Sequence, residues 1–201
     1  VYLDVSFNRL RDVTPLRALT ALTELYAISN KLTAVPPAAH FATHLTRLRV
    51  LELGSNRVRT IENVAPLLAL DSLWLGRNKI TALGALALPT LRVLSLQSNR
   101  ITRLEPLAAC TRLEELYLSH NGVRRIEQLD SLARTLRVLD LGTNFVDSLD
   151  GLPHGSRLVA LEELWLNDNR IDDWHHVERV MLTSLAAAPK LTALYLEGNP
   201  V

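Results

Sequence analysis

The sequence predicts an α/β solenoid, a right-handed curved superhelix with a parallel β-sheet on its concave side and short helical or irregular segments on its convex side. The segment LRVLELGSN, residues 48–56, has leucine at its first, fourth and sixth positions and asparagine at its ninth. Nine such units follow one another with their asparagines 21 to 30 residues apart, and apolar residues recur at every third position between them. A unit of this length, built on leucines, predicts a leucine-rich repeat solenoid.

Each unit is expected to supply one short strand. Leu51 and Leu53 should point to one side of the strand and Glu52 to the other, because side chains alternate in direction along a strand. One unit cannot cover both of its apolar edges, so neighbouring units must stack with their strands parallel. We expect the nine asparagines to be structural, each bonding the backbone of the turn that leaves its strand: Asn8, Asn30, Asn56, Asn78, Asn99, Asn121, Asn144, Asn169 and Asn199.

The first convex segments follow the three-residue step, which is the period of a tight helix or of extended turns. Between residues 10 and 25 a large apolar residue stands at every third position. Residues 35–44 are an expansion, and Pro36 and Pro37 prevent a regular helix through that point. We therefore expect a bulge on the convex side there.

The later segments are regular up to Asn144 and then expand twice. GLPHGSR, residues 151–157, is rich in turn-forming residues and predicts a loop. Residues 172–188 predict a true helix with Trp174 in its apolar set, because two acidic residues stand at the end that the helix dipole favours for negative charge.

Composition indicates one elongated domain at residues 1–201, since a solenoid grows by adding repeats. The net charge of +1 predicts no general attraction to nucleic acid or to a membrane surface. Charges interrupt every apolar run, and no signal-like segment is visible, so we expect a soluble protein. Both ends fall inside repeats without polar capping units, so we expect a fragment of a longer protein.

The single cysteine, Cys110, occupies an apolar slot that Leu67 fills in an earlier repeat. A buried thiol is therefore expected, and one cysteine cannot form an internal disulfide framework. The chain also has no Asn-x-Ser/Thr sequon. Both features favour an intracellular protein.

No motif of catalysis is present: the sequence has no phosphate-binding loop, dinucleotide fingerprint, HExxH or CxxC. His40 with His44, and Asp172 with His176, have the four-residue spacing of metal-binding pairs on a helix, but neither pair has an evident third ligand. We interpret both as solvated surface pairs. The sequence therefore predicts no enzyme and no catalytic, cofactor or metal site.

The residue between the two inward positions of each strand should project from the concave face. Of these nine residues five are aromatic and three acidic, although the chain has only ten Phe, Trp and Tyr. Strand propensity explains part of this enrichment, but not tryptophans on a face that the repeat leaves uncovered. A binding surface is the better interpretation, since aromatic anchors form the centres of interfaces. The nine residues are Asp4, Tyr26, Glu52, Trp74, Ser95, Tyr117, Asp140, Trp165 and Tyr195.

The wider concave strip is acidic. Its 27 positions, which include Glu163, contain seven acids and no lysine or arginine, so the partner should be a protein that offers basic residues, and nucleic acid is disfavoured. A row of basic residues instead follows the asparagines, and we expect these to be solvated charges facing neighbouring acids: Arg9, Lys31, Arg57, Lys79, Arg100 and Arg170.

Several segments resemble one protein family: VLELGSNRVRTIENV, LWLGRNKIT, LSLQSNRIT, LEELYLSHNGV, LEELWLNDN and LYLEGNP are similar, in this order, to the regulatory subunit 7 family of type-1 protein phosphatase. The similarity runs through nearly the whole chain. It implies a non-catalytic protein of nucleus and cytoplasm that holds the phosphatase catalytic subunit on its concave face, often together with inhibitor-3. It also implies a role in maturation or holding of that subunit, not catalysis.

The resemblance also implies a set of contact residues at the centres of the strands. Tyr26 and Trp74 stand where the family typically has phenylalanine. Trp74, Trp165 and Tyr195 would be apolar anchors, and the acids would meet basic residues of the phosphatase; Tyr117 joins the set from the strand pattern. The matching residues are Asp4, Tyr26, Glu52, Trp74, Asp140, Glu163, Trp165 and Tyr195.

Two other functions fit the repeats. One is a structural adaptor of the spliceosomal or ciliary leucine-rich type, which holds another protein. The other is the recognition arm of a larger enzyme, because a fold does not fix a function.

Overall fold

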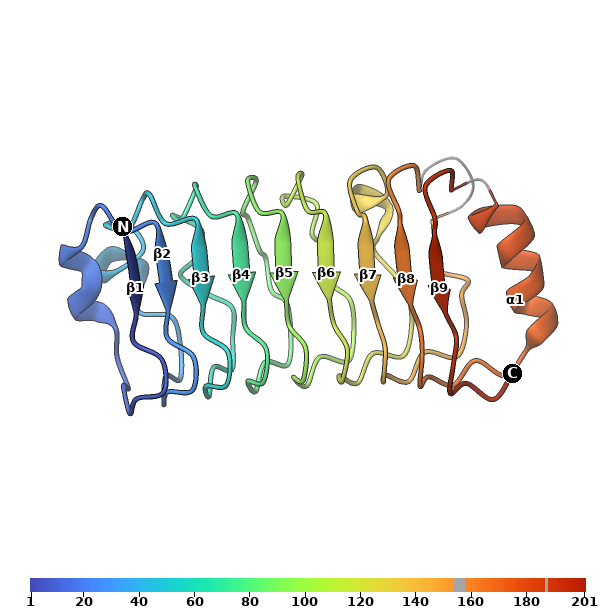
Figure 1. The fold of residues 1–201 in the computed structure, drawn as a ribbon, viewed down its shortest axis with the longest axis horizontal. Coiled ribbons are helices and arrows are strands. Elements are labelled where there is room, and N and C mark those ends of the chain that lie inside the picture. The colour runs from blue at the N-terminus through green and yellow to red at the C-terminus, as the bar shows by residue number, and fades with distance from the viewer. Residues whose placement is uncertain (154–157, 187) are drawn as a thin grey trace.

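The computed structural model describes residues 1–153, 158–186 and 188–201. Within these ranges nine short strands form one parallel sheet in the order of the sequence, from β1 to β9 (Figure 1). The predicted solenoid is therefore confirmed. The strands are Tyr2–Asp4 (β1), Glu24–Tyr26 (β2), Val50–Glu52 (β3), Ser72–Trp74 (β4), Val93–Ser95 (β5), Glu115–Tyr117 (β6), Val138–Asp140 (β7), Glu163–Trp165 (β8) and Ala193–Tyr195 (β9).

The middle residue of every strand is leucine, and the leucines are in register from strand to strand, as with Leu51 beside Leu73. From Leu25 to Leu164 these side chains have at most 1% of their surface exposed, whereas Leu3 and Leu194 in the two outer strands are partly exposed. They join the convex leucines in one core cluster. Because the middle residue points inward, the first and third residues of each strand face the concave side.

The asparagines hold the turns that follow the strands. The Asn78 side chain donates to the carbonyls of Leu53, Leu75 and Gly76 at 2.9, 3.0 and 3.2 Å and accepts from the Val58 backbone N–H at 2.9 Å. Each therefore ties its own turn to the preceding repeat, and the structural interpretation is confirmed. The same four bonds occur at Asn30, Asn56, Asn99, Asn121, Asn144 and Asn169.

Asn199 makes three of these four bonds, and the first asparagine, Asn8, departs further. It is exposed and donates to the Val5 and Ser6 carbonyls of its own turn. The residue before each asparagine from Asn8 to Asn169 has a φ angle between 52° and 56°, a left-handed conformation that costs free energy in a non-glycine residue. The amide bonds offset that cost.

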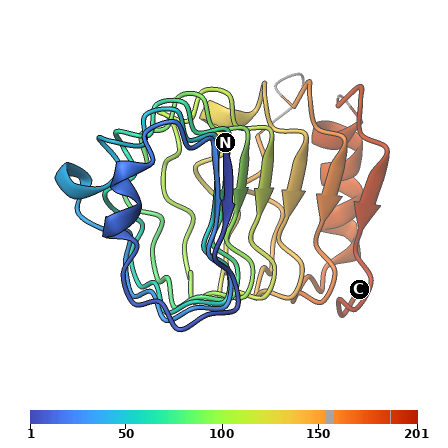
Figure 2. The same cartoon turned by 60° about the vertical axis from the view of Figure 1, so that its left-hand side comes forward.

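The convex segments are irregular or form short 3-10 helices: Thr14–Ala18, Ala38–His40 and Asp130–Leu132. The expansion at residues 35–44 does form the expected bulge. Its short helix follows Pro37 and stands out on the side away from the strands (Figure 2), while Phe41 turns into the core with 1% of its surface exposed. Cys110 is fully buried, as expected.

The C-terminal helix forms with one difference from the prediction. It begins as α1, Trp174–Val180, after Asp173, whose carboxylate accepts the His176 backbone N–H at 3.0 Å. It continues as a π-helix, Met181–Leu185, instead of a regular α-helix. None of the helices in the described ranges is long and apolar enough to cross a membrane.

Trp174 was expected in the apolar set of the helix, but 54% of its surface is exposed, because α1 turns Val177 and Val180 toward the core instead. Of the predicted loop at residues 151–157, Gly151 and Leu152 form a turn and bend and Pro153 is irregular; the remainder lies outside the described residues, as does residue 187 of the predicted helix.

Candidate functional site on the concave face

The register of the sheet places the nine predicted concave residues in one continuous row. The third residue of each strand pairs with the third residue of the next, so that Glu52 lies beside Trp74 and Asp140 beside Trp165. The first residues of the strands form a parallel row on the same face, which includes Glu163 in β8. Alternation along the strands thus gathers residues from the whole chain on one surface.

The rings in this surface contact one another in pairs. Tyr2 and Tyr26 meet edge to face with their centroids 5.8 Å apart. Trp74 and Tyr117 are stacked at 6.3 Å, and Trp165 and Tyr195 are tilted at 4.4 Å. Contacts of this kind hold rings in fixed orientations and contribute beyond the area that they bury.

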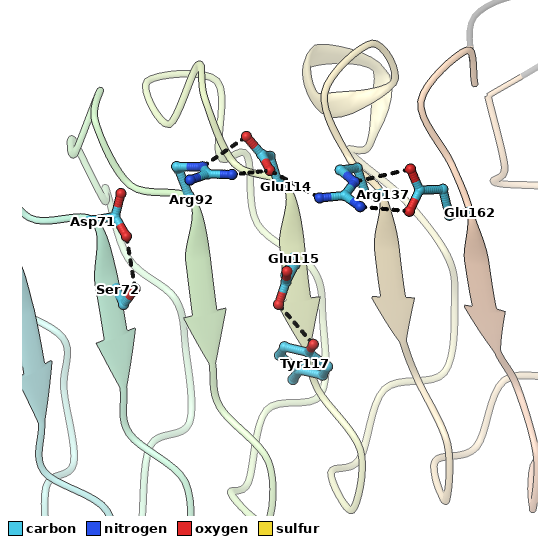
Figure 3. Close-up of polar contacts among 8 residues, drawn as sticks. All are labelled: Asp71, Ser72, Arg92, Glu114, Glu115, Tyr117, Arg137 and Glu162. Carbon is cyan, nitrogen blue, oxygen red and sulfur yellow. Dashed lines mark hydrogen bonds and ion pairs between the residues drawn. The ribbon is translucent and has the colours of Figure 1, made fainter. Parts of the chain in front are cut away.

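Three of these rings each donate their polar hydrogen to a carboxylate that stands two residues earlier in the same strand. The Tyr117 hydroxyl donates to Glu115 Oε2 at 2.8 Å (Figure 3), and the Trp165 Nε1–H donates to Glu163 Oε2 at 2.9 Å. In β2 the Tyr26 hydroxyl donates to Glu24 Oε2 at 3.0 Å. The motif Glu-Leu-aromatic produces this contact because residues two apart lie on the same face of a strand.

These bonds change the acidity of the phenols. Burial first, and then the hydrogen bond to Glu115, raise the pKa of Tyr117 to about 12. The hydrogen bond from Tyr26 to its carboxylate raises the pKa of Tyr26 as well. Both rings therefore stay neutral donors, and the negative charge of the face remains on the carboxylates.

The acids near the N-terminal end of the row differ from one another. Burial, with a smaller effect of the Asp4 charge, raises the pKa of Glu52. Hydrogen bonding from Ser6 lowers the pKa of Asp4. Burial disfavours the charged form of the Glu52 carboxyl, and a cationic group placed over it would favour that form again.

Two concave residues are less accessible than the sequence predicts. Ser95 has 3% of its surface exposed, because its strand lies between those of Trp74 and Tyr117, whose rings meet above it. Asp140 has 7% exposed; its carboxylate accepts the Gly142 backbone N–H at 2.9 Å and the Gln97 side-chain amide at 3.0 Å.

Asp140 stays a predicted contact residue, and both of its oxygens already accept hydrogen bonds within the chain. Trp165 and Tyr195 are the open anchors, with 37% and 42% of their surfaces exposed, while Trp74 is half-buried.

A hollow of about 430 Å³ lies on the concave face beside Trp74. Gly54 and Gly76 contribute to its lining, where the absence of side chains leaves space. Glu52 and Gln97 also line it. The surface thus combines projecting rings at β8 and β9 with a depression near β3 and β4.

The sequence interpretation missed a ladder of ion pairs at the edge where the strands begin. Arg92 donates from Nε and Nη2 to the two Glu114 oxygens at 2.9 and 2.8 Å, and Arg137 donates in the same way to Glu162 at 3.1 and 2.8 Å (Figure 3). Arg137 Nη1 also lies 3.6 Å from Glu114. Arg92 lowers the pKa of the Glu114 carboxyl, and Arg137 lowers that of Glu162.

A signal for this ladder is present in the sequence. The residue immediately before each strand alternates in charge over six repeats, so that facing neighbours in the sheet carry opposite signs. These residues are Arg49, Asp71, Arg92, Glu114, Arg137 and Glu162.

The basic row after the asparagines does not face acids as expected. Within the described ranges, no carboxylate lies within 4.0 Å of its six cationic groups. Arg170 instead stacks over the Phe145 ring at 4.3 Å. Except for Arg9, their backbone N–H groups donate to the preceding repeat, as Arg57 does to the Leu32 carbonyl at 2.8 Å, and this holds the backbone of the row in place.

The interpretation of Asp172 and His176 as a solvated pair was wrong for the histidine. His176 has 6% of its surface exposed; its Nε2 accepts the Leu149 backbone N–H at 3.1 Å and lies 3.2 Å from Ser148 Oγ. It therefore packs α1 against the preceding repeat. The His40 side chain lies outside the described residues, and the described part of the chain brings no three potential metal ligands together.

Similar proteins share the repeat. The sequence profile described as "Leucine Rich repeats (2 copies)" matches residues 68–109, 89–134 and 111–154. The protein phosphatase 1 regulatory inhibitor subunit PPP1R7 homolog of Arabidopsis thaliana is 40% identical over 86 residues, which are 42% of this chain and 25% of that protein. Human leucine-rich repeats and immunoglobulin-like domains protein 1 is 32% identical over 173 residues, 84% of this chain and 14% of that protein.

Solved structures share the architecture. Internalin C2 of Listeria monocytogenes superimposes with a TM-score of 0.75 and 28% identity, covering 96% of this chain and 80% of that chain. The chain spans a quarter or less of the length of the two curated relatives.

Proposed function

Since this chain is a leucine-rich repeat solenoid, we propose that it is a non-catalytic regulatory scaffold that binds the catalytic subunit of a type-1 serine/threonine protein phosphatase on its concave face. Its setting would be the nucleus and cytoplasm, and inhibitor-3 would be a second partner. The resemblance of the repeats, and the name of the Arabidopsis relative, support this partner.

One observation carries the proposal: Trp165 and Tyr195 form a fixed aromatic pair that stays open to solvent. Their rings are 4.4 Å apart, and the Trp165 Nε1–H is held by Glu163. Large rings with a defined orientation are suited to anchor an interface, because little conformational entropy is lost when a partner covers them.

The charge of the face supports a basic partner. Seven carboxylates and no lysine or arginine occupy the 27 positions of the concave strip. Such a strip steers a positively charged surface toward the rings and disfavours phosphate backbones.

The test is a calorimetric titration of type-1 phosphatase catalytic subunit into the wild-type chain and two variants. Trp165→Ala should weaken binding by about 2 kcal/mol or more, roughly a 30-fold rise in Kd, as for truncation of a central anchor. Trp174→Ala is the matched control, because Trp174 is also exposed but lies on α1. No binding by the wild type, or equal loss in both variants, would refute the proposal.

A further inference from the structure

The edge where strands β5 to β9 begin, uppermost in Figure 1, carries a surplus of positive charge. A hollow of about 520 Å³ lies there, and we name it the basic hollow. Five cations and one acid line it: Arg92, Arg112, Arg134, Arg137, Lys190 and Glu114. Together with Glu162, which Arg137 contacts, the count is five positive and two negative charges, a surplus of three in a chain whose net charge is +1.

Two of these cations are already held in place. Arg92 and Arg137 each use Nε and Nη2 to grip a carboxylate, at 2.8 to 3.1 Å. In Arg92 the Nη1 amino group takes no part in that grip. A guanidinium fixed in this way is pre-organised, so a second anion that binds it loses little side-chain entropy.

The other three cations form no close ion pair, although the charge of Lys190 helps to lower the pKa of Glu162. Arg112, Arg134 and Lys190 are exposed, and in the described part of the chain no carboxylate lies within 4.0 Å of their charged groups. They come from three different repeats, and the register of the sheet brings them to one hollow. The surplus charge is therefore local to this edge.

We propose that the basic hollow binds a phosphorylated serine or threonine side chain of a protein partner. A phosphate monoester carries nearly two negative charges and three acceptor oxygens, which match fixed guanidinium donors together with mobile cations. A single carboxylate would add only one charge in competition with Glu114 and Glu162. A long polyanion would have to cross these two acids, whereas one compact dianion need not.

The probe is a fluorescein-labelled pentapeptide with one phosphoserine among glycines, measured by fluorescence anisotropy beside the same peptide with serine or aspartate. The phosphorylated peptide should bind at least about tenfold tighter than the other two, because a charge-assisted contact to a dianion is stronger than one to a single charge. Equal binding of the three peptides would overturn the proposal.

Two double variants with the same charge change locate the site. Arg112→Ala with Lys190→Ala should weaken phosphopeptide binding about tenfold, since it removes two cations without breaking an ion pair of the ladder. Arg57→Ala with Arg100→Ala, exposed residues after the asparagines on the opposite edge, should change it less than about twofold. If both double variants lost the same amount of phosphopeptide affinity, the attraction would come from net charge alone, and this would overturn the site.

Folding and competing ligands are controlled in the same series. Thermal melting confirms that each variant is folded, and Arg134→Ala serves as an independent single variant that should also weaken binding. Phosphatidylserine vesicles and a single-stranded oligonucleotide are tested as competing ligands. If either bound tighter than the phosphopeptide, and if the same double variant abolished that binding, the proposed class of partner would be contradicted. None of these measurements involves the concave face, so the two proposals can fail independently.

Discussion

The Trp74 and Tyr117 rings stack 6.3 Å apart although a complete strand, β5, lies between their strands. The small side chain of Ser95 permits this, because it leaves room for the two rings to lean together above it. On the concave face, side chains two strands apart thus contact one another. Which of its residues are accessible depends on which ones their neighbours leave uncovered.

Tyr117 should ionise unusually late. Its pKa is raised to about 12, so the neutral phenol stabilises the fold, fully below pH 10 and progressively less as the pH rises from 10 through 12. Spectrophotometric titration of the phenolate should show a transition near pH 12 that Tyr117→Phe removes. Glu115→Gln should move it toward pH 10, because the neutral amide repels phenolate less. A transition unaffected by Tyr117→Phe would contradict this assignment.

Asn78 should be a large contributor to stability. Asn78→Ala leaves three carbonyls and one backbone N–H without their partner in a buried turn, and we expect the free energy of unfolding to fall by roughly 3 kcal/mol. Asn8→Ala is the control, since Asn8 is exposed, and it should cost less than about 1 kcal/mol. Urea denaturation measures both. Equal costs would show that the buried bonds are not what stabilises the turns.

Cys110 should react only after unfolding. The thiol is fully buried, and burial raises its pKa, so the reactive thiolate is disfavoured. Ellman's reagent should therefore modify Cys110 slowly in the native protein and rapidly in denaturant. Rapid reaction without denaturant would contradict the burial of this repeat.

Much of the fold follows from the sequence because the signal is repeated. The alternation in Leu51-Glu52-Leu53 fixes the direction of each side chain, and Asn56 with its equivalents fixes the turn. Repetition specifies the register, so the row from Asp4 to Tyr195 is confirmed residue by residue.

The features that could not be predicted from the sequence depend on contacts between residues of different repeats. The burial of Asp140 arises from Gln97, which belongs to a repeat two positions earlier, and no pattern within one strand encodes it. His176 appeared to be a surface residue because its partners, Ser148 and Leu149, are nearly thirty residues away in sequence. The ion-pair ladder could have been predicted from the alternating charges that precede the strands.

The most direct test of the concave-face proposal is hydroxyl-radical footprinting of the chain with and without type-1 phosphatase catalytic subunit. Trp165, Tyr195 and Trp174 are all exposed in the free chain, so their oxidation can be compared in one sample. The account predicts that the complex protects Trp165 and Tyr195 several-fold and leaves Trp174 unchanged. Protection of Trp174 with continued oxidation of Trp165 and Tyr195 would contradict it.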